Sequence, residues 1–159
     1  MALNLPKVLT LAAAAGLTLG FLGAQPAQAQ SDEDRRMLAL NLYHEARSEG
    51  REGMAAVGWV TLNRVADPEF PNTITGVITQ TRRGSCEFGW WCDGKSDEPT
   101  EAELWSEAQS VADELLNEPG TDPTDGALFF MESFRGTPGW MQKLRKSAEI
   151  GNHNFFARP

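Results

Sequence analysis

The chain has 159 residues, which is room for one domain, and a formal net charge of −8 at pH 7. It contains no extended run of Lys and Arg, so binding to nucleic acid or to an anionic membrane surface is not expected. The composition excludes these partners and favours no other.

Residues 1–29 have the features of a secretory signal peptide. Lys7 gives a weakly positive start, an apolar run extends from Val8 to Leu22, and Ala27-Gln28-Ala29 places small residues at the cleavage position. A transmembrane anchor is the alternative, but the run is shorter than the ~20 apolar residues that a bilayer core requires. We therefore expect an exported protein with no stable membrane insertion after signal removal, whose mature domain covers residues 30–159.

Apolar residues at helical intervals predict three helices in the first half of the mature chain. The first covers residues 35–49. The second covers residues 52–65, has almost no polar face and is therefore expected to be buried. A short third helix is expected over residues 73–80.

Residues 82–99 are rich in Gly and aromatic side chains and are expected to be irregular. They contain the only two cysteines, Cys86 and Cys92. In an exported protein such a short-range pair is usually a disulfide, which here would constrain the loop that carries Trp90 and Trp91. A zinc site is the alternative, but two thiols without a nearby His or second Cys pair make a poor structural site. We expect neither a metal nor a cofactor.

The second half of the chain predicts one more helix and two strands. The helix runs from residue 100 to 116, with Thr100 and Glu103 at the spacing of a capping box. Residues 127–131 and 152–157 are expected to form buried strands. The sum is a single, mainly helical α+β domain with a small β-sheet.

In the first predicted helix, Asn41, Glu45 and Glu49 are spaced i, i+4 and i+8 and so form one stripe beside the apolar face. Apolar neighbours would raise the pKa of Glu45, and the carboxylate of Glu49 would act in the same direction. A carboxyl group that stays protonated near neutral pH can protonate a glycosidic oxygen. From spacing alone, however, the favoured interpretation is that both carboxylates are solvated and pair with nearby arginines (Arg47, Arg51 or Arg64).

Other chemistries have weaker support in the sequence. A zinc protease helix requires His-Glu-x-x-His, but Ser48 stands three residues after Glu45, and the only other histidine is His153. No Gly-x-Ser-x-Gly motif is present, so serine catalysis has no support. Tryptophans stack on sugar rings, and we expect Trp90 and Trp91 to be exposed for such contacts, whereas Trp59 and Trp105 are expected to pack in the core.

Several short sequence motifs resemble the spore-cortex-lytic and cell-wall hydrolase family, and they occur along the chain in the same order as in that family. They are Tyr43-x-Glu45-Ala46-Arg47-x-Glu49, Ala56-Val57, Leu62-Asn63-Arg64-Val65, Phe70-Pro71-Asn72-Thr73-Ile74, Asp122-Pro123-Thr124-x-Gly126-Ala127-Leu128-Phe129-Phe130 and Ile150-Gly151-Asn152-His153-x-Phe155. The segment from Cys86 to Gly94, together with Pro138-Gly139-Trp140, is similar to the Gram-negative branch, which implies a periplasmic or cell-envelope location. Two positions depart from the family: Ser48 replaces a common Gly, and Met54 replaces a common Gln.

The resemblance implies a lysozyme-like catalytic domain with one essential acid, which falls on Glu45. Its substrate would be peptidoglycan, cleaved between N-acetylmuramic acid and N-acetylglucosamine, as a lytic transglycosylase. An amidase and a non-catalytic wall-binding protein are the alternatives. Candidate substrate contacts are Tyr43, Glu49, Trp90, Phe130 and His153, and for His153 a structural role is equally favoured. We see no wall-binding segment in this sequence and therefore consider a wall-targeting protein partner.

Overall fold

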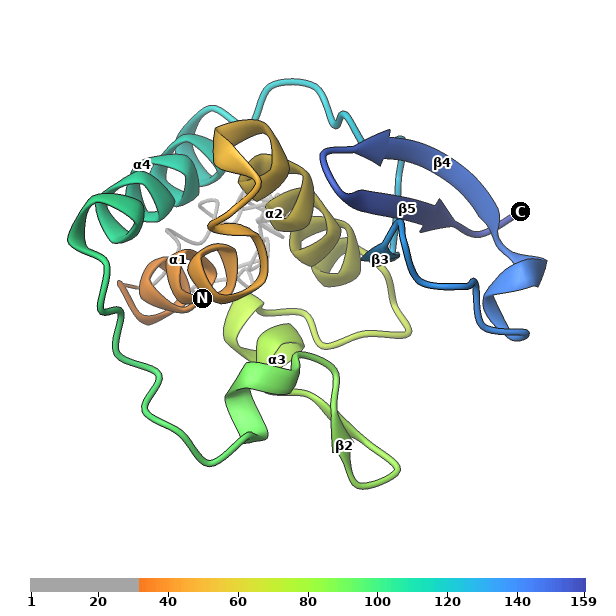
Figure 1. The fold of residues 1–159 in the computed structure, drawn as a ribbon, viewed down its shortest axis with the longest axis horizontal. Helices are drawn as coiled ribbons and strands as arrows, with labels where there is room; N and C mark the ends of the chain where they lie inside the picture. Colours follow the sequence, from red (N-terminus) through yellow and green to blue (C-terminus); the bar gives the residue numbers. More distant parts are fainter. Residues whose placement is uncertain (1–31) are drawn as a thin grey trace, which may run out of the picture.

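The computed structural model describes residues 32–159, so the expected signal peptide lies outside the described residues. Three long helices, α1 (Asp32–Ala46), α2 (Gly50–Ala66) and α4 (Ala102–Asn117), pack against one another (Figure 1). The short helix α3 (Ile74–Ile78) contacts α1 and α2. All four predicted helices are therefore present, with shifted ends.

Helix α1 ends three residues earlier than predicted. The amide of Glu49 donates to the carbonyl of Ala46 (3.0 Å) and closes the last turn. Gly50 follows with a φ of +68°, a left-handed conformation that favours glycine. Glu49 therefore belongs to the turn before α2 and not to α1. The prediction that Glu49 extends the helical stripe of Asn41 and Glu45 is wrong.

The central helix α2 packs closely against α4. Gly58 lies at this contact, where a Cβ atom would come within 2.3 Å of Cδ1 of Leu115 and force that side chain to move. The predicted capping box of α4 is wrong, because Glu101 is the N-cap residue and makes no side-chain cap. Instead, the hydroxyl of Tyr43 accepts hydrogen bonds from the amides of Thr100 and Glu101 (3.1 and 3.2 Å).

A three-stranded antiparallel sheet has the order β3-β5-β4, formed by β3 (Phe129–Glu132), β4 (Arg145–Ile150) and β5 (His153–Ala157). Strands β3 and β5 correspond to the two predicted strands, and they place Glu132 opposite His153. Strand β4 was not predicted, because its sequence is mostly polar and most of its residues are exposed or half-buried.

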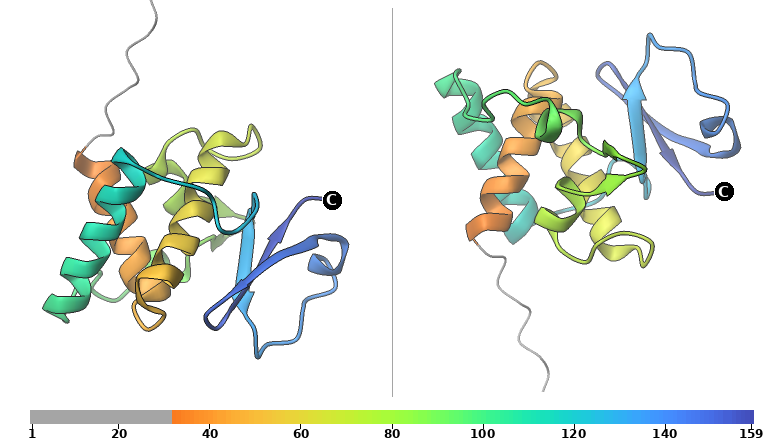
Figure 2. Two further views of the ribbon diagram at one scale, coloured as in Figure 1. Left: turned by 90° about the horizontal axis from the view of Figure 1, so that it is seen from above. Right: turned by 90° about the horizontal axis from the view of Figure 1, so that it is seen from below.

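The sheet lies at one end of the molecule, with α2 between it and the pair formed by α1 and α4 (Figures 1 and 2). At the start of the predicted irregular region, β1 (Thr81–Arg82) and β2 (Ser85–Cys86) form a small hairpin that leads into η1 (Gly89–Cys92), a 3-10 helix. A second 3-10 helix, η2 (Met141–Lys143), precedes β4. No helix within residues 32–159 is both long and apolar enough to cross a bilayer.

Candidate active site

A cleft of about 580 Å³ opens where the helices meet the sheet. Its walls are formed by α1, α2, the segment from β2 into η1, β3 with the turn that follows it, and β5. The lining residues are His44, Glu45, Arg64, Glu87, Phe88, Gly89, Phe130, Met131, Glu132, Arg135 and His153. The cleft thus combines aromatic surface with several ionisable groups. Among these ionisable residues, Glu45 is the acid that the sequence predicted.

Glu45 is half-buried near the C-terminal end of α1. Within residues 32–159, its carboxyl group makes no hydrogen bond or salt bridge. Burial raises the pKa of Glu45 to about 7, against the lowering effect of the Arg64 charge and with a further raising effect from Glu132. Near neutral pH this carboxyl group can therefore both give up and take back a proton.

The carboxylate that raises the pKa of Glu45 is Glu132 and not Glu49. Glu49 does not line the cleft. It accepts hydrogen bonds from the backbone amide and the side-chain amide of Asn152 (2.7 and 3.1 Å), and the backbone bond is the main reason why the pKa of Glu49 is lowered. Glu132 was not among the predicted site residues, although the predicted strand ended one residue before it.

Arg64 is a buried cation in the wall of the cleft. Its Nε donates to the carbonyl of Leu128 (2.8 Å), and its guanidinium lies 5.2 Å from the ring centroids of both Phe70 and Phe88. Burial lowers the pKa of Arg64 to about 10, while the charge of Glu87 acts in the opposite direction. At neutral pH Arg64 therefore still carries its charge.

The arginines proposed as partners of Glu45 are engaged elsewhere. Arg47 pairs with Glu101 (3.0 Å), and Arg51 pairs with Glu114. The nearest carboxylate oxygen to Arg64 is that of Glu87, 3.9 Å from Nη1. The interpretation of Glu45 as an ordinary solvated, ion-paired surface residue is therefore wrong.

Trp90 is buried, which corrects the expectation of an exposed ring. Only 8% of its surface is accessible, because η1 turns the indole onto α1. There it stacks on His44, with ring centroids 4.6 Å apart, and its Nε1 donates to Oδ1 of the buried Asn41 (3.0 Å). Trp91 remains 39% exposed, as expected, and Trp59 and Trp105 pack against the core, as predicted.

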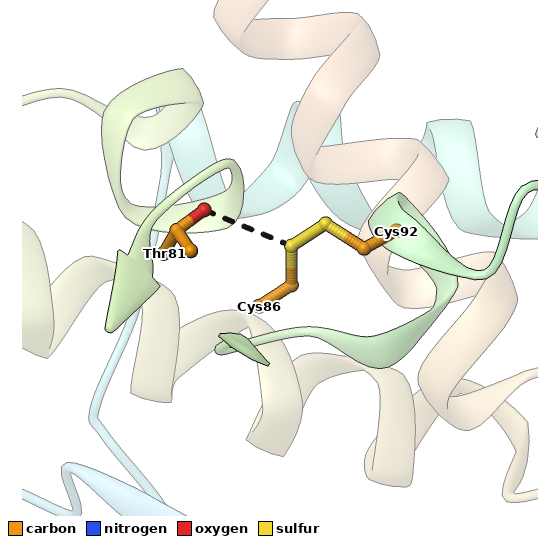
Figure 3. The surroundings of a disulfide bond; sticks show 3 residues. All are labelled: Thr81, Cys86 and Cys92. Carbon is orange, nitrogen blue, oxygen red and sulfur yellow. Dashed lines mark hydrogen bonds between the residues drawn. A yellow bond between two sulfur atoms is a disulfide. The ribbon is translucent and has the colours of Figure 1, made fainter. Parts of the chain in front are cut away.

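The expected disulfide joins Cys86 in β2 to Cys92 at the end of η1 (Figure 3). The hydroxyl of Thr81 lies 3.8 Å from Sγ of Cys86. The bridge closes the loop that carries Phe88, Gly89 and Trp90, and two of these three residues line the cleft. Within residues 32–159, no three His, Cys, Asp or Glu side chains are grouped so as to hold a metal ion.

Residues 48–156 match the Cell Wall Hydrolase family. The chain belongs to the cell wall hydrolase family. It is 33% identical over 130 residues to the spore cortex-lytic enzyme of Oceanobacillus iheyensis, covering 80% of this chain and 43% of that protein. Against the spore cortex-lytic enzyme of Bacillus subtilis it is 33% identical over 126 residues, covering 79% and 38%. The chain thus spans less than half the length of these relatives.

Two solved structures share the fold. The catalytic domain of the Bacillus cereus SleB protein matches with a TM-score of 0.66 and 28% identity, covering 85% of this chain and all of that domain. The catalytic domain of the germination-specific lytic transglycosylase SleB from Bacillus anthracis matches with a TM-score of 0.66 and 31% identity, covering 84% and 100%. The predicted α+β, lysozyme-like fold is confirmed.

The candidate substrate contacts of this cell wall hydrolase fall into two groups. Phe130 and His153 line the cleft together with Glu45. Tyr43, Glu49 and Trp90 do not line it. The Tyr43 hydroxyl accepts from the start of α4, and hydrogen bonding there, mainly with Thr100, lowers the pKa of Tyr43. These three residues instead support the walls of the cleft.

The two departures from the family pattern lie outside the cleft. Met54 is fully buried in the core, and Ser48 is exposed, with its hydroxyl 3.4 Å from Oε1 of Glu49. Neither residue contributes to the cleft wall. The surroundings of Glu45 are therefore built from residues other than these two.

Proposed function

We propose that this cell wall hydrolase cleaves the glycan strands of peptidoglycan between N-acetylmuramic acid and N-acetylglucosamine, as a lytic transglycosylase. The observation that carries the proposal is Glu45, a cleft carboxyl group whose pKa is raised to about 7. The similarity to SleB of Bacillus anthracis, which is named a lytic transglycosylase, supports the same reaction class.

Glu45 acts first as an acid and then as a base in this reaction. The protonated carboxyl group gives its proton to the glycosidic oxygen as the bond from that oxygen to C1 of the muramoyl residue breaks. The resulting carboxylate then takes the proton of the C6 hydroxyl, and O6 bonds to C1 to give a 1,6-anhydro end. Because the attacking hydroxyl belongs to the same sugar, closure avoids the entropic cost of binding and orienting a water molecule.

Glu132 supports a second candidate, which is hydrolysis of the same bond. It places a second carboxylate in the cleft with Glu45, and a pair of carboxyl groups is what a conventional glycosidase uses. Water would then replace the C6 hydroxyl as the attacking group, and the product would carry a reducing end.

Mass spectrometry of muropeptides released from purified peptidoglycan separates these reactions. We expect anhydro ends; reducing ends would indicate hydrolysis, and stem peptides freed from intact glycan would indicate an amidase. Glu45→Gln should abolish release, whereas Glu49→Gln, which alters a carboxylate outside the cleft, should not. Binding of the protein to sedimented peptidoglycan with no released fragments would favour a non-catalytic wall-binding protein.

We also propose that residues 1–29 direct export to the periplasm or cell envelope and that residues 30–159 form the catalytic domain. The support is the order of charged, apolar and small residues in the leader, and the similarity of the Cys86–Gly94 segment to the Gram-negative branch. Cell fractionation with mass analysis of the N-terminus tests both points. Pull-down of the exported protein tests for a wall-targeting protein partner.

A further inference from the structure

Two buried nitrogen atoms, on side chains that line the cleft, have no hydrogen-bond partner within residues 32–159. They are Nη1 of Arg64 and Nδ1 of His153, which belong to side chains on α2 and β5 that line the cleft with Glu45. Arg64 is only 5% exposed and His153 only 6%. Buried polar groups are almost always hydrogen-bonded, so two unpaired nitrogens in one cleft require an explanation.

Arg64 can act only as a donor here, because a guanidinium has no acceptor atom. Its position is fixed by the hydrogen bond from Nε to the carbonyl of Leu128 and by the rings of Phe70 and Phe88. The carboxylate of Glu87 lies 3.9 Å from Nη1, which is beyond hydrogen-bond distance. Among the described residues, the N–H groups of Nη1 are therefore held in place without an acceptor.

His153 can supply an acceptor. Its ring is held between Phe130 and Phe155, with centroid distances of 5.4 and 6.2 Å. Burial lowers the pKa of His153, although the charges of Glu49 and Glu132 act in the opposite direction, so the neutral imidazole is favoured at neutral pH. When Nε2 carries the proton of a neutral imidazole, Nδ1 is an acceptor.

We propose that Arg64 and His153 form a subsite in this cleft for the acetamido group of an N-acetylated sugar. Nη1 of Arg64 donates to the acetamido carbonyl, and Nδ1 of His153 accepts the acetamido N–H. The methyl group packs on Phe88 and Phe130, which line the same cleft. This inference rests on the proposed cleavage of glycan strands and adds the substituent that the cleft selects.

Selection follows from the buried state of the two nitrogens. A site built to hydrogen-bond a substrate group discriminates strongly against an analogue without it, because the buried partners then stay unpaired. A sugar with a free amine presents no carbonyl to Arg64 and adds a positive charge beside a guanidinium. The cleft therefore disfavours de-N-acetylated strands.

The test compares kcat/KM on three preparations of one glycan: N-acetylated, chemically de-N-acetylated, and N-formylated strands. The formyl group keeps the carbonyl and the N–H and removes the amine charge, so it separates hydrogen bonding from charge. We expect the formylated strands to be cleaved within roughly fivefold of the acetylated strands, because they lose only the contact of the methyl group. Both should be cleaved at least ~10-fold faster than the free-amine strands. Equal rates on all three, or formylated strands as slow as the free-amine strands, would overturn the subsite.

Variants assign the preference to the two side chains. His153→Phe keeps a ring without nitrogen, and Arg64→Lys keeps the charge without Nη1. Each should lower the ratio of the rate on acetylated strands to the rate on free-amine strands roughly tenfold, whatever its effect on the rates themselves. His153→Asn, which can place an acceptor near the Nδ1 position, should restore part of the preference. Arg158→Lys, whose arginine pairs with Asp67 and Glu69 outside this cleft, is the control.

The outcomes separate the two proposals. Cleavage of glycan without preference for the acetamido group overturns the subsite and leaves the proposed function intact. Absence of glycan cleavage on every preparation overturns the proposed function. If the Arg64 and His153 variants do not fold, the comparison of the three strand preparations with the unmodified protein still decides.

Discussion

Glu132 lies in the same cleft as Glu45, and its negative charge opposes the ionisation of Glu45. Glu132 comes from β3, Glu45 from α1, and the two are 87 positions apart in the sequence. Arg64, in the same cleft, acts in the opposite direction on Glu45. The pKa of the candidate acid is therefore set by its burial and by two opposite charges that tertiary structure brings to it.

Glu132→Gln should shift the activity of the enzyme toward acid pH. Removing the charge of Glu132 removes one cause of the raised pKa of Glu45, so Glu45 loses its proton at a lower pH. The alkaline limb of the profile of kcat/KM against pH should move to lower pH, with a loss of roughly two- to fivefold above pH 7. Glu149→Gln, an exposed carboxylate on β4, is the matched control. An unchanged profile for Glu132→Gln would show that Glu132 does not influence Glu45.

Glu45→Gln should lower activity by on the order of 10²–10⁴-fold while it stabilises the fold at alkaline pH. The pKa of Glu45 is raised from 4.5 to about 7. The protonated carboxyl group therefore makes its full contribution to the free energy of unfolding below pH 4.5, and this contribution is lost as the pH rises through 7. Glutamine cannot ionise and does not lose this contribution. Denaturation by urea at pH 5 and pH 8 should therefore show a gain of roughly 1–3 kcal/mol for the variant at pH 8 and almost none at pH 5. Lower stability than the unmodified protein at pH 8 would contradict the assignment of a buried, unpaired carboxyl group.

Elements with apolar periodicity were predictable from the sequence, and positions set by tertiary contacts were not. The four helices and the strands β3 and β5 follow from apolar spacing, whereas the role of Glu45 as the acid rests on the resemblance to the family motif and stays a prediction. The end of α1 was missed because it depends on a turn at Glu49 and Gly50, where the helical pattern continues in the sequence. Strand β4 was missed because it is mostly polar.

The surroundings of Glu45 illustrate the same limit. Glu132 and Arg64 act on Glu45 only because β3 and α2 meet at one cleft, and no short-range spacing signals this. The burial of Trp90 depends on an acceptor, Asn41, that lies 49 positions away. Trp90 lies in the constrained loop that the sequence predicts, but the direction of its ring depends on this distant contact.

Glu49→Ala should lower stability and affect activity only indirectly. Glu49 connects the α1–α2 turn to the β4–β5 turn through its two hydrogen bonds with Asn152, and β5 begins at the next residue, His153. Loss of these charge-assisted bonds from a partly exposed site should cost about 1 kcal/mol at pH 7. The pKa of Glu49 is lowered, so this contribution is present above its unfolded value of 4.5 and is lost as the pH falls below it.

Urea denaturation at pH 7 and pH 3 measures the effect of Glu49→Ala. Glu52→Ala, at an exposed position in the first turn of α2, is the control and should change stability little. The difference between the two variants should shrink at pH 3. A difference that is equal at both pH values would mean that the charge of Glu49 contributes nothing.

Replacement of both cysteines by serine should destabilise the protein by about 2 kcal/mol, because the short loop between Cys86 and Cys92 gains conformational freedom in the unfolded state. The loop also carries Gly89, which lines the cleft, and Trp90, which stacks on His44. The activity of the double variant should therefore fall more steeply with temperature than that of the unmodified protein. Urea denaturation followed by tryptophan fluorescence measures the stability change. Dithiothreitol should lower the midpoint of the unmodified protein toward that of the double variant and leave the double variant unchanged. If the reductant shifts both proteins equally, or shifts neither, the disulfide does not stabilise this loop.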